Sequence, residues 1–177
     1  MGVVGTALTE PEQRPGIRRA LIAALAGGLA AGTVDVFAAS LIYHAPPDVI
    51  LRAIASGLLG KASFQGGWES AAIGLGSQWL ISVCAAAVYV AAATRFPVLL
   101  QHALRFGPPF GAGVFIVMHT VVVPLSKANP ALPHPLPLAE DFAANMLFGL
   151  IIALAAKKLL YRESAAQSAG AAYKRPR

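Results

Sequence analysis

The stretch that decides the fold is residues 20–43, ALIAALAGGLAAGTVDVFAASLIY. Its 24 residues carry one charged side chain, Asp35. A helix rises 1.5 Å per residue, so about 20 apolar residues cross a hydrocarbon layer roughly 30 Å thick. The stretch therefore predicts a membrane-spanning helix.

Three more uncharged runs follow in a chain that is 56% hydrophobic and only 12% charged, with a mean hydropathy of +0.63. Soluble domains average about 25% charged residues. We predict an all-α membrane protein, a bundle of four transmembrane helices at about 20–43, 70–94, 106–125 and 139–161. The last uncharged core, 142–156, is short, so Lys157 and Lys158 should snorkel towards the interface.

A short amphipathic segment separates the first two predicted spans. Pro46 and Pro47 end the first span, and Asp48 stands where an N-cap belongs. The segment 48–60 places Ile50, Leu51, Ile54 and Leu58 on one face. We expect a helix lying in the outer membrane interface, with an ordinary loop helix as the alternative.

The flanking charges predict the orientation. The cytoplasmic lead (1–19), the 95–105 region and the basic tail (162–177) together with Lys157 and Lys158 hold 11 Lys and Arg, against 3 on the other side. Basic residues accumulate on the cytoplasmic side, so both termini should be cytoplasmic, in a bacterial inner membrane. We expect the tail to be disordered. A cleaved signal peptide ending near Ala38 and Ala39 is the alternative for the first span, and it leaves the other orientations unchanged.

Asp35 is the first candidate functional residue. A carboxylate within a span costs roughly 2.5–3.5 kcal/mol on insertion scales, so it normally faces protein or water. Gly28 and Gly32 share its helix face and form a small-xxx-small pair. Asp35 should therefore point into the bundle.

The other spans carry comparable stripes with a spacing of four residues. Counted at 1.5 Å per residue, their polar members lie about 18 to 25 Å from the cytoplasmic flank, as Asp35 does. The sequence thus predicts a polar cluster in the outer half of the bilayer, formed by Asp35, Gln78, His119 and Asn145. The predicted helix-packing residues are Gly28, Gly32, Gly74, Gly111 and Gly149.

Two interpretations of this cluster stay open. In the first, the polar groups only join helices, and the chain is a structural or accessory membrane protein that acts through helix packing. In the second, Asp35 and His119 exchange a proton or hold a small polar or cationic ligand, in an oligomeric transport, sensing or proton-linked protein. Expected partners are the lipid bilayer and either a second copy or another membrane protein.

Other function classes have little support in the sequence. There is no phosphate-binding loop, serine nucleophile motif or HExxH, so enzyme chemistry is not indicated. The histidines lack ligand spacing and Cys84 is the only cysteine, so no metal site, cofactor or intrachain disulfide is expected. The basic residues flank apolar segments without interleaved aromatics, which argues against nucleic acid.

The stretch FGAGVFIVMHTVVVPLSKANP, residues 110–130, together with the acidic start of the fourth span, is distantly similar to YagU-type inner-membrane proteins. The first span and the stretch 50–68 also resemble small uncharacterised bacterial membrane proteins. The YagU-type likeness covers the last two predicted spans. It implies a bacterial inner membrane and a purposeful placement of His119 and Pro124, and it implies no substrate.

Overall fold

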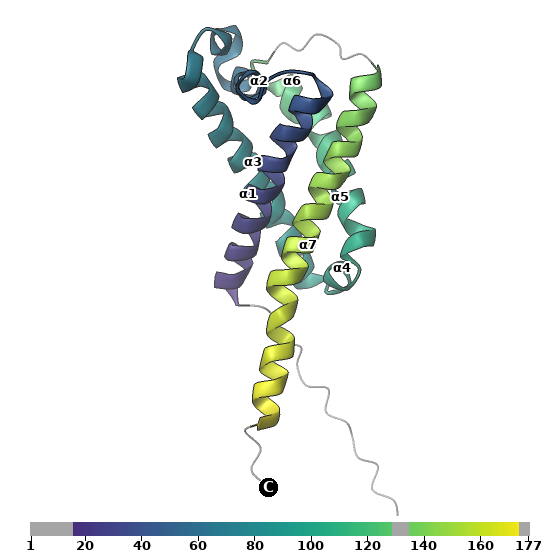
Figure 1. Cartoon of the computed structure of the whole chain (residues 1–177). Coiled ribbons are helices and arrows are strands. Elements are labelled where there is room, and N and C mark those ends of the chain that lie inside the picture. The colour runs from purple at the N-terminus through teal and green to yellow at the C-terminus, as the bar shows by residue number, and fades with distance from the viewer. Residues whose placement is uncertain (1–15, 129–134, 174–177) are drawn as a thin grey trace, which may run out of the picture.

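The computed structural model describes residues 16–128 and 135–173, and throughout these ranges the regular structure is helical (Figure 1). The elements are α1 (Ile17–Ile42), α2 (Pro47–Leu59), η1 (Gly60–Phe64), α3 (Gly67–Arg95), α4 (Val98–Gln101), α5 (Ala103–Val117), η2 (Met118–Val122), α6 (Val123–Leu125) and α7 (Pro135–Tyr173). Four stretches are long and apolar enough to cross a membrane: Ile17–Ile42, Gly67–Arg95, Ala103–Leu125 and Leu138–Leu160. The predicted all-α fold with four such helices is confirmed.

The four long helices form a bundle in which α1 packs against α7. Helix α3 packs against α1, and α5 packs against α7. The start of α1 and the far end of α7 lie at the same end of the molecule, which we call the terminal end (Figure 1). The opposite end, where α2 and α6 lie, is the α2 end.

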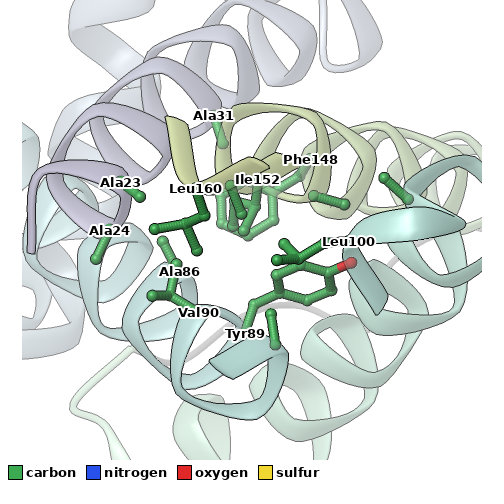
Figure 2. Packing of buried hydrophobic residues seen from close by; sticks show 14 residues of the cluster. Ala23, Ala24, Ala31, Ala86, Tyr89, Val90, Leu100, Phe148, Ile152 and Leu160 are labelled. Atoms are coloured by element: carbon green, nitrogen blue, oxygen red, sulfur yellow. The ribbon is translucent and has the colours of Figure 1, made fainter. Parts of the chain in front are cut away.

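The apolar core lies between α1, α3 and α7 and consists largely of small side chains (Figure 2). Ala31 and Ala86 are fully buried, and Ile152 is the largest side chain with almost no exposure. On the far side of the core, the Tyr89 hydroxyl donates to the Leu99 carbonyl over 3.1 Å. Because lipid tails are as apolar as leucine, close van der Waals packing of this kind is what holds such helices together.

All five predicted packing glycines face another helix. A Cβ on Gly28 would lie 2.5 Å from Cα of Val83, and one on Gly32 would lie 2.9 Å from Cβ of Ser82. A Cβ on Gly74 would overlap the Leu51 carbonyl of α2. In the α5–α7 contact, Gly111 meets the backbone of Asn145 and of Gly149.

Helix α2 exists close to its predicted limits, but its start differs from the prediction. Pro47 is its first residue and Pro46 its N-cap, and Asp48 makes no capping bond. Asp48 instead pairs with Arg52 one turn later, because the helix begins one residue earlier and places both side chains on one face. The Lys127 amide donates to the Gly57 carbonyl over 2.9 Å, so α2 is anchored both to α3 and to the segment after α6.

The prolines of the third span also lie deeper than predicted. The span predicted at 106–125 places Pro108 and Pro109 in its first helical turn, but α5 begins at Ala103 and holds both in its interior. Proline has no amide hydrogen, so the carbonyls of Leu104 and Arg105 lose their usual helical donors. Both of these residues are exposed at the terminal end, where water or lipid headgroups can satisfy the carbonyls.

Helix α7 is longer than predicted in both directions. It begins at Pro135, so Glu140 and Asp141 lie within the helix rather than at its start. Its backbone stays helical to Tyr173, where we expected disorder from Arg162 onward. The alanine-rich tail has a high intrinsic helix propensity and continues an already formed helix, which needs no new nucleus.

The glycine contacts predict opposite effects for two alanine substitutions on α5. Alanine favours a helix over glycine by about 1 kcal/mol, so Gly113→Ala should stabilise the protein, because a Cβ there meets nothing within 4 Å. Gly111→Ala should lower the free energy of unfolding by about 1–3 kcal/mol, because its Cβ would overlap the Asn145 carbonyl. Unfolding in mixed detergent micelles measures both. Equal effects would contradict the close α5–α7 approach.

Candidate functional site

A carboxylate and an amide join α1 to α3. The Gln78 side-chain amide donates from Nε2 to Oδ2 of Asp35 over 2.8 Å. Gln78 is 9% exposed, and its backbone carbonyl accepts from the Ser82 hydroxyl over 2.7 Å. Nearby, the Trp79 indole donates to the Thr33 hydroxyl over 3.1 Å. Asp35 therefore faces protein and has a hydrogen-bond donor, as its high cost in lipid requires.

A second ionisable pair lies between η2 and α7. Nε2 of His119 is 3.7 Å from Oδ2 of Asp141. Nδ1 of His119 is 3.1 Å from the Phe115 carbonyl oxygen one turn earlier. Asn145, one turn beyond Asp141, donates from Nδ2 to the Asp141 backbone carbonyl over 3.0 Å.

The carbonyl of Phe115 determines the tautomer of His119. A carbonyl oxygen only accepts, so Nδ1 must carry the hydrogen, and in a neutral ring Nε2 is then also an acceptor. A carboxylate likewise only accepts. His119 and Asp141 therefore attract each other only when a proton resides on one of them, giving either an imidazolium or a neutral carboxylic acid.

Aromatic rings surround this pair. The Phe115 ring lies 4.0 Å from the His119 ring at an interplanar angle of 31°, and it meets Phe142 edge-on at 5.2 Å. The side chains of His119 and Asp141 are 36% and 19% exposed, so the protein encloses the pair only in part.

A π-helical turn positions His119. The segment η2 leads into α6, whose second residue, Pro124, has no amide hydrogen to donate to the Thr120 carbonyl. The Thr120 hydroxyl donates to the Ile116 carbonyl over 2.7 Å, just as His119 does to Phe115. Single π-helical turns of this kind often occur at functional sites.

The two pairs are electrostatic neighbours. The charge of Asp141 acts on Asp35, and it also acts on Tyr43, which lies just beyond α1. Partial burial, together with the Asp141 charge, raises the pKa of the Tyr43 hydroxyl above its usual value. Tyr43 therefore stays neutral in the field of Asp141.

Only two members of the predicted cluster of four contact each other. Asp35 and Gln78 contact each other directly, whereas His119 faces Asp141 and Asn145 bonds within α7. The depth estimate carried no information on the rotation of α7. Asp141 was missed as a site residue, because we assigned it to the first turn of its span. Its i, i+4 spacing with Asn145 was the signal that could have identified it.

Metal-ligand geometry is not seen in the described part of the chain. Across residues 16–128 and 135–173, no three His, Cys, Asp or Glu side chains gather where they could hold an ion. The chemistry that this arrangement offers is proton exchange and hydrogen bonding.

Fold and site together define a class: a multi-pass helical membrane protein with ionisable groups inside its spans. No protein-family model, curated protein or solved structure matches the chain.

The Asp35–Gln78 bond can be tested by two substitutions of different severity. Asp35→Asn keeps an acceptor for Gln78 and should change the free energy of unfolding by less than about 1 kcal/mol. Gln78→Leu leaves Asp35 inside the bundle without its donor and should cost about 1–3 kcal/mol. Thermal unfolding in detergent compares the two variants. A milder effect of Gln78→Leu would contradict the pairing.

The tautomer of His119 is directly measurable. We expect ¹⁵N NMR of ring-labelled protein to show the hydrogen on Nδ1 in the neutral state of His119, because the Phe115 carbonyl accepts it. His102, at the other end of α5, provides the reference spectrum. A neutral His119 with its hydrogen on Nε2 would exclude the arrangement.

Proposed function

We propose that this chain is a proton-linked membrane protein, in which the His119–Asp141 pair binds and releases a proton. The observation that supports the proposal is the facing of two acceptors, Nε2 of His119 and the Asp141 carboxylate, across 3.7 Å in a span. Ionisable residues within a membrane span are costly and typically mark proton or ion pathways.

Nearby ionisable groups interact electrostatically with the His119–Asp141 pair, so its protonation changes their interactions as well. The titratable groups that act on Asp141 or are acted on by it are Asp35 of α1 and Tyr43 just after α1, with Gln78 of α3 bonded to Asp35. Gaining one proton changes the net charge of this group by one unit where the dielectric is low and screening is weak. Such a change favours a different arrangement of η2 against α7, which suits either transport or sensing.

We also propose the setting of this activity. The basic residues favour a bacterial plasma membrane with both termini cytoplasmic and the α2 end outside. The likeness to YagU-type proteins in residues 110–130 agrees with that membrane. Four spans are few for a transporter built from inverted repeats, so a transport role calls for an oligomer.

A structural or accessory role is the second candidate function, and the low burial of the α5 span favours it. The apolar window of its span is only 11% buried, against 39% for α1. The packing glycines already contact the chain's own helices, so a partner would bind through the remaining face of α5 and not through the predicted glycine faces.

Amide hydrogen exchange in nanodiscs tests the proton-linked function. After correction for intrinsic exchange, amides of η2 and the facing turn of α7 should differ in protection between pH 5 and pH 8. His119→Gln and Asp141→Asn should each abolish the difference, because each removes one member of the proton-holding pair. Asp35→Asn should reduce it, because Asp35 acts electrostatically on the same site.

The control is His102→Gln, which removes a histidine at the terminal end and should leave the pH difference intact. Persistence of the pH difference in both His119→Gln and Asp141→Asn would sink the proposal. Proton flux into proteoliposomes then separates transport from sensing, since only a transporter moves protons.

A further inference from the structure

Four basic residues lie on the elements that pack against α4, and we call them the terminal basic surface: Arg95, Arg105, Lys157 and Lys158. Arg95 ends α3, Arg105 lies in the first turn of α5, and the lysines come from α7. The structure ties these elements together, since Nζ of Lys157 donates to the Gln101 carbonyl at the end of α4 over 3.2 Å. Positive charge from three helices thus meets at one end of the molecule.

The described side chains supply no carboxylate to this surface. Their acidic residues all belong to the other half of the molecule: Asp35, Asp48, Glu69, Glu140 and Asp141. The ion pairs recorded there join Arg52 to Asp48 and His119 to Asp141. Among the described side chains, positive charges therefore outnumber negative ones at the end of the molecule that carries Arg105 and Lys158.

Large apolar side chains lie beside these charges. Phe96 is 63% exposed and Leu104 is 71% exposed, and they directly follow Arg95 and precede Arg105 in the chain. A surface for nucleic acid or a soluble phosphate needs only the charges. Exposed apolar groups next to cations match a lipid instead, whose phosphate and acyl chain are joined in one molecule.

We propose that the terminal basic surface binds the headgroup of an anionic phospholipid. The Arg105 guanidinium offers paired donors that fit phosphate oxygens, and Lys158 adds a second positive charge. The acyl chains then lie along Leu104 and the lipid-facing side of α5. This inference is independent of the proposed proton site, which lies in the other half of the spans.

Native mass spectrometry with equal amounts of phosphatidylglycerol and phosphatidylcholine tests the proposal. The wild-type protein should retain phosphatidylglycerol preferentially. Each basic residue near an anionic surface contributes about a fivefold change in affinity, so Arg105→Gln/Lys158→Gln should lower the preference by about 25-fold. Both residues are exposed, so the double variant should keep its fold, which thermal unfolding in detergent checks.

The matched control is Lys61→Gln/Lys127→Gln, which removes the same number of charges at the α2 end. It should keep the wild-type preference. Equal retention of the two lipids by the wild-type protein would overturn the proposal, and so would an equal loss in the two double variants. Normal lipid selectivity in a protein that fails the pH test would leave this inference standing and remove only the proton site.

Discussion

Polar atoms inside hydrocarbon must find their partners within the protein, and the rest of this structure depends on that constraint. Asp35 accepts from Gln78, and His119 uses Nδ1 on a carbonyl of its own helix. The bond made by Nδ1 of His119 leaves the other ring nitrogen without a hydrogen-bond donor. That nitrogen, Nε2, is an acceptor that faces another acceptor, the Asp141 carboxylate. The two attract each other only when one of them carries a proton.

Close helix contacts make these pairings possible. Gly28 and Gly32 let α1 approach α3 until Ser82 and the turn carrying Gln78 lie against it, which brings Gln78 within reach of Asp35. In the same way, Gly111 admits the backbone of Asn145, one turn from Asp141, and so sets the distance between α7 and the histidine that follows on η2. The glycines therefore determine the polar geometry as well as the packing.

The two ends of the molecule differ in chemistry. The α2 end holds a helix docked crosswise through Gly74 and Gly57, together with all of the carboxylates among the described side chains. The terminal end holds basic residues beside exposed apolar ones. This separation supports an orientation in the membrane, with the carboxylates in one half of the described structure and the basic surface at the other end.

The sequence alone determined the four spans, the short helix after the first span and the inward direction of Asp35, because hydropathy and a fixed rise of 1.5 Å per residue are local properties. It also identified Gln78 as a residue at the depth of Asp35. Only the tertiary structure decided that His119 faces Asp141 and not Asp35. That outcome depends on the rotation of α7, on the early start of this helix at Pro135 and on the π-helical turn before Pro124. Helix rotation and irregular turns arise from packing between helices, which a periodic pattern within one helix does not encode.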